Sequence, residues 1–161
     1  MVTATLTPDA VREVVAVVPD PELPMVTIEQ LGILRGVRVS EAGHVTVDIT
    51  PTYSGCPAMD AIRADIVAAL ASAGIDDVEV RLVLAPAWTT DWITEEGREA
   101  LRRHGIAPPG PPGRVSIAFS VRCPHCGSPA TRELSRFGST ACKALWVCTD
   151  CQEPFDHVKA L

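Results

Sequence analysis

Two pairs of cysteines near the C-terminus constrain the fold of this chain more than any other feature. Cys123 and Cys126 form one C-x2-C pair, Cys148 and Cys151 form the second, and 21 residues separate the pairs. A tight C-x2-C turn supplies two sulfurs on one side, and structural zinc takes four such ligands in a tetrahedron. The spacing therefore predicts a zinc ribbon, a small β domain. An iron site with four thiolates is the main alternative, because its sulfur geometry is similar.

Composition also indicates the cellular compartment and excludes two classes of partner. No apolar run approaches the ~20 residues that cross a bilayer, and the N-terminus lacks the basic and apolar segments of a signal peptide. We therefore expect a cytoplasmic protein with no membrane partner, in which clustered cysteines bind metal and do not form disulfides. Residues 1–113 hold 8 Arg against 16 Asp and Glu. This acidic surface argues against nucleic acid as a partner, because phosphate contacts need basic side chains.

Apolar spacing before the cysteine pairs predicts alternating helices and strands. Helices are expected over residues 8–18, 57–73 and 94–105, and strands over 33–39, 44–50 and 78–84. Prolines and glycines in residues 108–113 predict a stiff linker. The expected organisation is a first domain over residues 1–107, the linker, and a ribbon over 114–161 that begins with a strand over 115–121.

Two loops contain candidate functional side chains. Asp20 and Glu22 lie in a stretch with three prolines, which cannot be the interior of a helix. They are either functional carboxylates or simply solvated ones. A second loop is a candidate surface for a partner, and it contains Trp88, Thr89, Asp91 and Trp92. Its two tryptophans are equally well explained as rings that cover the edge of the core.

Two further cysteines lie outside the predicted zinc ligands. Cys56 precedes Pro57 at the expected start of a helix, where unpaired N–H groups and the helix dipole favour a thiolate. It is either a reactive or metal-binding thiol with a lowered pKa, or an inert packed residue. Cys142 precedes Lys143 and is either a small buried residue or an accessible accessory thiol with a lowered pKa.

Several motifs together resemble a known family. The small iron–sulfur assembly domain shared by SufT-like and cytosolic iron–sulfur targeting proteins has motifs similar to residues 20–24, 31–33, 50–57 and 86–92. Residues 123–128, 137–145 and 148–155 narrow the resemblance to the PaaD family, which is encoded with the multicomponent phenylacetyl-CoA epoxidase. The resemblance implies a small α/β (α+β) domain with a mixed sheet of about three strands and flanking helices, followed by a β zinc ribbon.

The resemblance also implies a function in phenylacetate catabolism. The protein would be an accessory factor, not catalytic by itself, that helps to mature a metal centre of the epoxidase. Its clients would be the iron–sulfur cluster of the reductase component or the di-iron site of the oxygenase component. Transient handling of iron or an iron–sulfur cluster then falls on Cys56, with Asp20 and Glu22 in its acidic loop. Zn²⁺ would be the structural cofactor of the ribbon.

Two other functions remain open at this point. The chain is alternatively a non-catalytic docking component of the epoxidase, or a hydrolase or transferase that uses Cys56 as its nucleophile. The enzyme would need a histidine base within hydrogen-bond reach of the thiol. His44 and His104 are the available histidines before the linker, and neither lies in a recognisable motif. A homodimer that pairs through the edge of the sheet is a further expectation.

Overall fold

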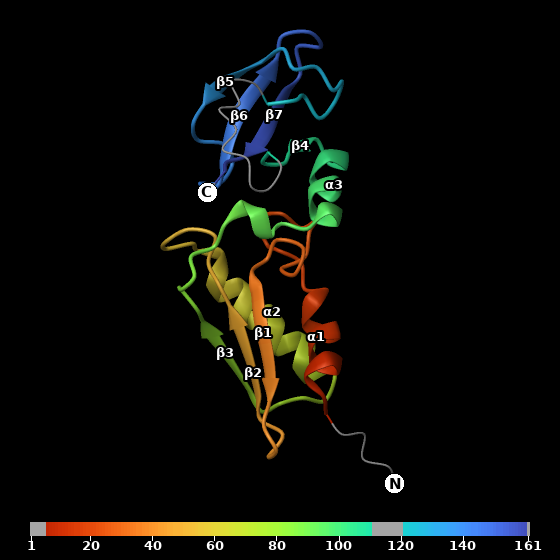
Figure 1. Cartoon of the computed structure of the whole chain (residues 1–161), viewed down its shortest axis with the longest axis vertical. Coiled ribbons are helices and arrows are strands. Elements are labelled where there is room, and N and C mark those ends of the chain that lie inside the picture. The colour runs from red at the N-terminus through yellow and green to blue at the C-terminus, as the bar shows by residue number, and fades with distance from the viewer. Residues whose placement is uncertain (1–5, 111–120, 161) are drawn as a thin grey trace. The chain divides into compact units, whose positions relative to one another are not determined.

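The computed structural model describes residues 6–110 and 121–160 of the chain (Figure 1). Contacts between residues divide it into two compact units, Met1–Trp88 and Thr89–Leu161. We call them the N-terminal unit and the C-terminal unit. Within the described ranges, no helix combines the length and the apolar character needed to cross a membrane.

A three-stranded mixed sheet forms the centre of the N-terminal unit. Its strands are β1 (Leu34–Val39), β2 (Val45–Ile49) and β3 (Val78–Leu82), in the order β1-β2-β3. β1 and β2 are antiparallel neighbours, as the predicted hairpin requires, whereas β3 runs parallel to β2. The long connection between β2 and β3 contains helix α2, because parallel neighbours cannot be joined by a tight turn. The predicted mixed sheet of three strands is thus confirmed.

Two helices pack in the N-terminal unit, α1 (Pro8–Ala16) and α2 (Ala58–Ser72) (Figure 1). The side chain of Thr7 caps α1 by accepting a hydrogen bond from the N–H of Ala10, and Pro8 occupies the first turn. Both helices bury one apolar stripe, consisting of Val11 and Val15 in α1 and of Ile62, Ile66 and Leu70 in α2. These side chains form the core with the inward residues of β2.

The third strand ends earlier than its alternating pattern predicts. The alternating pattern extends to Leu84, but β3 ends at Leu82. Leu84 is 70% exposed and Leu82 is 45% exposed. Val83 still donates a backbone hydrogen bond to Ile49 of β2, after which the chain leaves the sheet toward Pro86. A proline has no N–H for a strand ladder, which is consistent with the end of the strand here.

The C-terminal unit contains a short turn of 3₁₀ helix, one α-helix and a second sheet. The helical elements are η1 (Thr90–Trp92) and α3 (Glu95–Arg103), and the strands are β4 (Ile106–Ala107), β5 (Thr131–Ser135), β6 (Lys143–Cys148) and β7 (Pro154–Val158). The strand order is β4-β7-β6-β5. Strands β5, β6 and β7 form an antiparallel meander, and β4 adds to it in parallel with β7.

The contacts place the division of the chain between Trp88 and Thr89 rather than in the predicted linker 108–113. The reason is tertiary: β4 pairs with β7, and α3 contacts β4, so both elements join the C-terminal unit. Linker residues 111–113 and nearly all of the strand expected over 115–121 lie outside the described residues.

Candidate metal centre

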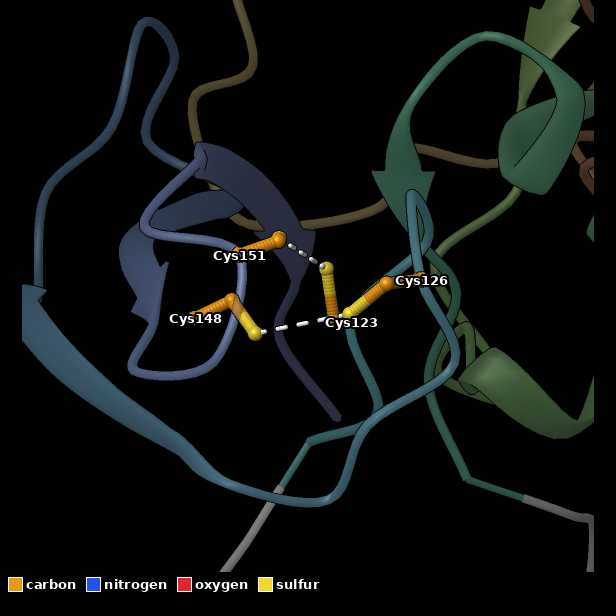
Figure 2. A group of neighbouring side chains, drawn as sticks. All are labelled: Cys123, Cys126, Cys148 and Cys151. Atoms are coloured by element: carbon orange, nitrogen blue, oxygen red, sulfur yellow. Dashed lines mark hydrogen bonds between the residues drawn. The ribbon is translucent and has the colours of Figure 1, made fainter.

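Four cysteine sulfurs come together in the C-terminal unit. Figure 2 shows Cys123 and Cys126 on one turn and Cys148 and Cys151 on another, with their side chains pointing toward one another. All four Sγ atoms lie within 4.8 Å of one another. Two of the separations are 3.7 Å, between Cys123 and Cys151, and 3.6 Å, between Cys126 and Cys148. In the part of the chain that the structure describes, no other group of three or more potential ligands gathers in this way.

The four sulfurs fit a tetrahedral zinc ion. A tetrahedron with Zn–S bonds of about 2.3 Å places its sulfur atoms about 3.8 Å apart. The two measured separations, 3.6 and 3.7 Å, agree with this value. The same set of donors would also accept a rubredoxin-like iron, so the geometry assigns a four-thiolate metal centre and not the element.

The two turns that carry the sulfurs share one backbone design. In the first, the N–H of Cys123 donates to Ser128 O at 2.9 Å, and in the second the N–H of Cys148 donates to Glu153 O at 3.0 Å. The residue after the last cysteine of each turn has a positive φ, 76° at Gly127 and 63° at Gln152. This conformation folds the turn back so that both of its sulfurs face the same side. A glycine adopts it without steric cost, whereas a glutamine does not.

The ionisation of the thiols explains why the site needs a cation. The backbone N–H of Cys151, followed by that of Asp150, lowers the pKa of the Cys148 thiol to about 7. The N–H of Glu153 acts in the same direction on Cys151, but burial and the neighbouring thiols outweigh it and raise the pKa of Cys151 to about 12. Four sulfurs this close cannot all ionise alone, and a divalent cation among them removes the repulsion and favours deprotonation.

A small apolar cluster lies beneath the centre. Cys123 and Cys148 are buried and pack with Ala107 of β4 and Phe155 of β7, whereas Cys126 and Cys151 are exposed. The partly buried residue Trp146 borders this cluster. The metal ligands are therefore continuous with the core of the unit, and the metal centre and the packing of β4 and β7 support one another.

A hydrogen-bonded bridge joins the two cysteine turns directly. The hydroxyl of Ser128, beside the first pair, donates to the carboxylate of Asp150, which lies inside the second pair. The N–H of Thr149 donates to Ala130 O at 2.8 Å, and its hydroxyl donates to the same oxygen at 3.0 Å. These bonds join the two turns in addition to any metal that their sulfurs share.

Two histidines near the centre are not among its ligands. His125 lies inside the first turn with an exposed side chain, and its ring lies against Gly105, just beyond α3. His157 of β7 instead contacts Ala107 O through Nδ1 at 3.1 Å and packs edge-on against Trp146. Burial lowers the pKa of His157, so it is neutral in the fold. Neither ring belongs to the group of four ligand atoms that gather at the centre.

The structure also contains a buried cation that the sequence analysis missed. Arg98 of α3 is 3% exposed. Its guanidinium donates to four backbone carbonyls at 2.7–3.3 Å, those of Thr90, Ile93, Pro109 and Gly110. Because the planar group presents several fixed donors, it can join the segment before α3 to the segment after β4. The available signal was its place on the apolar face of α3, three residues before the buried Leu101.

Cys56 lies in the N-terminal unit on the loop between β2 and α2. The N-cap of α2 is Pro57, so Cys56 precedes the cap rather than occupying it. Its side chain is half-buried, and its N–H donates to Tyr53 O at 3.3 Å. The expected position of Cys56 at the start of a helix is thus observed.

The expected lowering of the Cys56 pKa is wrong. Burial is the largest influence and raises the pKa of this thiol. The N–H of Ala58 and the side chain of Tyr53 stabilise the thiolate, but the charges of Glu22 and Asp20 again disfavour it. The helix start therefore contributes as predicted, and desolvation together with like charge outweighs it. Cys56 carries its proton at neutral pH.

The acidic loop lies near Cys56 but does not form a set of ligands with it. Asp20 is 6% exposed, and its Oδ1 accepts hydrogen bonds from the N–H groups of Glu22 and Leu23 at 2.9 and 2.8 Å. These bonds make Asp20 the residue that shapes the turn. Glu22 is half-buried. The two carboxylates and the thiol interact through charge, and the three groups are not gathered as a metal site.

Neither of the two candidate histidine bases influences the Cys56 thiol. The side chains that influence the Cys56 thiol are those of Tyr53, Glu22 and Asp20, with no histidine among them. His44 lies before β2, at the end opposite to the Cys56 loop, and contacts Asp77 at 2.8 Å. His104 belongs to the C-terminal unit, where its ring contacts Ala100 O at 2.8 Å.

The tryptophan loop divides into a covered part and a solvated part. Trp88 is 9% exposed, and its indole N–H donates to Leu31 O at 2.8 Å. The prediction that Trp88 lies on a surface for a partner is therefore wrong, because its ring covers the core of the N-terminal unit. In the C-terminal unit, Thr89 is half-buried and caps η1 by accepting from the N–H of Asp91. Asp91 is exposed and Trp92 is half-buried, so these two remain candidate surface residues.

Cys142 is half-buried at the start of β6. Its Sγ lies 3.1 Å from the hydroxyl of Thr140, and its backbone O accepts from Lys159. The neighbouring Lys143, which the sequence analysis placed beside an accessible thiol, is 5% exposed, and its Nζ lies 3.6 Å from Asp156. The ammonium group is therefore committed to an ion pair, and an accessory role of Cys142 stays a prediction.

Comparisons with known proteins agree with this two-part architecture. Residues 8–82 match the family model described as iron-sulfur cluster assembly protein, and residues 108–159 match that of the PaaD zinc beta ribbon domain. Among solved structures, the domain of unknown function DUF59 from Bacillus anthracis is similar, with a TM-score of 0.55 and 27% identity over 58% of this chain and 90% of that one.

Two curated relatives extend the likeness. One, from Escherichia coli (strain K12), is named as a component of a "Putative 1,2-phenylacetyl-CoA epoxidase" and is 47% identical over 162 residues, which cover 98% of each chain. The "Fe-S protein maturation auxiliary factor SufT" of Staphylococcus aureus (strain USA300) is 39% identical over 83 residues, covering 51% of this chain and 93% of that protein. The chain therefore belongs to the PaaD family, with an iron–sulfur cluster assembly domain followed by a zinc beta ribbon.

Proposed function

We propose that this chain is an accessory maturation factor of a phenylacetyl-CoA epoxidase system, in which it helps to assemble or insert an iron–sulfur or di-iron centre. One observation carries the proposal: the thiol of Cys56 lies on the loop that leads into α2 of an iron–sulfur cluster assembly domain. The near full-length similarity to a protein named as an epoxidase component supports the assignment to an epoxidase system. The similarity of the first half of the chain to the auxiliary factor SufT supports a role in maturation.

The surroundings of Cys56 suit a cargo that is held briefly. A protonated, half-buried thiol is a weak nucleophile at neutral pH. The charges of Glu22 and Asp20, which disfavour the thiolate, favour a cation at the same place. Arrival of iron would therefore replace the thiol proton and relieve the like-charge penalty. A single sulfur with carboxylates that do not converge on it fits transfer better than permanent binding.

The four-cysteine centre has a structural role in this proposal. We assign zinc to it because residues 108–159 match a family model described as a zinc beta ribbon, and its role is structural because a closed four-thiolate site leaves no coordination position for a substrate. Its ligands belong to the core cluster under β4 and β7, so the ion stabilises the C-terminal unit and takes no part in carrying iron. Purified protein should contain about one zinc per chain.

The chain is accordingly a binding factor that works in the cytoplasm, where thiols stay reduced, and it performs no catalysis of its own. Its clients are the reductase component, through its iron–sulfur cluster, or the oxygenase component, through its di-iron site. A docking component without a role in metal delivery is the second candidate, and the half-exposed Asp91 and Trp92 region would be one surface for it.

The deciding experiment expresses the epoxidase components together with wild-type protein, with no accessory protein, or with single-cysteine variants. Cys56→Ser and Cys56→Ala should fold, retain their zinc and bind the epoxidase, yet leave one component poor in iron or sulfide. Cys142→Ser is the matched control, because it removes another half-buried thiol outside the metal centre. Iron, sulfide and epoxidation of phenylacetyl-CoA are measured on each purified complex.

The outcomes separate the two candidates. Loss of client iron with Cys56→Ser, but not with Cys142→Ser, supports maturation. Full client metal content with both Cys56 variants would reject a metal-handling role for this thiol. If the epoxidase then still loses activity when the whole accessory protein is omitted, docking becomes the function.

A further inference from the structure

The outer edge of β3 has backbone groups that point away from its only neighbour among the described strands. β3 lies at the end of the order β1-β2-β3, and Figure 1 shows it at the side of the sheet. Asp77 O accepts from Val45 and Val83 N donates to Ile49, so the odd-numbered residues direct their N–H and C=O groups toward β2. Strand geometry then directs those of Val78, Val80 and Leu82 outward.

The side chains along this edge are unusually apolar for a solvent-exposed strand. Leu82 is 45% exposed, and α2, which contacts β3, exposes Val67 to 42%. The solvent side of α2 also presents three alanines, Ala64, Ala68 and Ala71. Asp60 and Asp65 are also exposed on α2, so the apolar part of its solvent side is the strip formed by Val67 and these alanines. Natural sheets usually protect an open edge of this kind.

We propose that a second copy of this chain covers the edge, by antiparallel pairing of β3 with β3 around a twofold axis at Val80. The charges along the strand are complementary to themselves in this register. Glu79 of each copy lies opposite Arg81 of the other, which gives two opposite-charge pairs related by the axis. Val78 lies opposite Leu82 of the second copy, and the two sheets become one of six strands.

The hydrogen-bonding pattern and the charges select this register over its neighbours. Pairing requires that outward-facing residues lie opposite each other, so the even-numbered residues must match and a slip by one residue is excluded. A twofold axis at Glu79 would place the two copies of Glu79 opposite each other. An axis at Arg81 would place the two copies of Arg81 opposite each other. Like charges directly opposite are destabilising. Of the three central registers, with the axis at Glu79, Val80 or Arg81, only the one at Val80 avoids both.

Arg81 is already held in position for such a pair. Its Nε donates to Asp48 of β2 at 3.0 Å, and Asp48 also accepts from Arg38 of β1. The Arg81 and Glu79 side chains are nevertheless 48% and 57% exposed. The pair would thus form between an arginine held by Asp48 and an exposed glutamate whose Oε2 lies 4.0 Å from His44 Nε2, at little further entropic cost to the arginine.

Analytical ultracentrifugation of the full-length, zinc-loaded protein over a wide range of concentrations tests the proposal. Wild-type protein should be in monomer–dimer equilibrium. Glu79→Arg places two arginines opposite each other on each side of the axis, and Leu82→Lys adds a charge at the edge. Each variant should raise the dimer Kd by about tenfold or more. The Kd of Glu79→Gln should lie between those of the wild type and of these two variants. Val17→Lys is the matched control, because Val17 is a 70% exposed apolar residue after α1.

Amide hydrogen exchange of the wild type tests the register without any substitution. Raising the protein concentration should slow exchange at Val78, Val80 and Leu82, whose N–H groups point outward, while those of Glu79 and Arg81 stay protected throughout. A strictly monomeric wild type overturns the proposal. So does a dimer whose Kd is unchanged by Glu79→Arg and Leu82→Lys, or one in which the amide of Val80 gains no protection.

Discussion

The four-cysteine centre and the Cys56 loop both contain cysteine sulfur outside any disulfide, and they are organised in opposite ways. In the C-terminal unit, four Sγ atoms already lie within 4.8 Å of one another, on turns that hydrogen bonds join. In the N-terminal unit, Cys56 stands alone with a raised pKa, and the nearby Asp20 is occupied by backbone N–H groups. A site that is complete in the fold suits permanent structural metal. A site that is incomplete suits a ligand that must leave again.

The largest effect is expected when one cysteine of the four-cysteine centre is removed. Cys148→Ser should abolish metal binding and unfold the C-terminal unit, because structural zinc contributes roughly 10–16 kcal/mol of apparent binding energy in small peptides. The loss should reach β4 and the Arg98 contacts, which belong to the same unit. Metal analysis together with amide exchange of the full chain measures both effects.

Variants at the other cysteines provide the comparison for this result. Cys56→Ser and Cys142→Ser should retain stoichiometric zinc and the exchange protection of both units. The N-terminal unit should also remain protected in Cys148→Ser. A C-terminal unit that stays folded without metal would show that hydrogen bonds and packing alone maintain the turns, and the contrast between the two sites would disappear.

The next effect concerns Arg98, the buried cation of the C-terminal unit. Arg98→Ala removes the donors of four backbone carbonyls and should lower the free energy of unfolding of this unit by about 3 kcal/mol or more. Arg103→Ala, at an exposed position of the same helix, should change it by less than about 0.5 kcal/mol. Chemical denaturation monitored by amide exchange of α3 measures the difference. Equal stability of the two variants would contradict the structural role of Arg98.

A smaller effect distinguishes the two cysteine turns from each other. Gly127→Ala places a side chain at φ 76° and should destabilise the zinc-bound unit by about 1–2 kcal/mol. Gln152→Gly relieves the same strain in the second turn and should stabilise the unit, by less than about 1 kcal/mol because glycine also has greater freedom when unfolded. Competition with a zinc chelator at fixed pH measures both changes, which should have opposite signs.

The smallest effect is a change in the reactivity of Cys56. Because burial and like charges raise its pKa, alkylation of zinc-loaded Cys142→Ser protein should be slow at neutral pH and should reach half of its maximal rate above the pH expected of an ordinary thiol. Asp20→Asn keeps an oxygen for the turn but removes a charge, so it should accelerate the reaction a few-fold at most, as should Glu22→Gln.

Glu41→Gln, in the exposed hairpin turn, is the control for these charge changes and should have no effect on the rate. A half-maximal rate below the ordinary thiol range would mean that the N–H of Ala58 dominates at Cys56. The loop would then offer a preformed thiolate, and the two cysteine sites would differ less than their geometry indicates.

Features that depend on neighbours along the chain could be predicted from the sequence. The group of four cysteine sulfurs follows from the C-x2-C spacing, because each pair of sulfurs is oriented by one local turn. Thr7 and Pro8 begin a helix, and the apolar spacing of residues 57–73 predicts α2, for equally local reasons. The hairpin of β1 and β2 was predictable from the turn between two alternating segments, whereas the mixed sheet of three strands was implied by the family resemblance.

Features that depend on residues from distant segments could not be predicted, because these residues come together only in the folded chain. The pKa of Cys56 rises because folding buries it near Glu22 and Asp20, whereas the sequence revealed only the local helix start. Trp88 is covered because its indole reaches Leu31, and β4 leaves the first domain because it pairs with β7. Desolvation and long-range hydrogen bonds have no fixed spacing in a sequence, so they become visible only when the chain is folded.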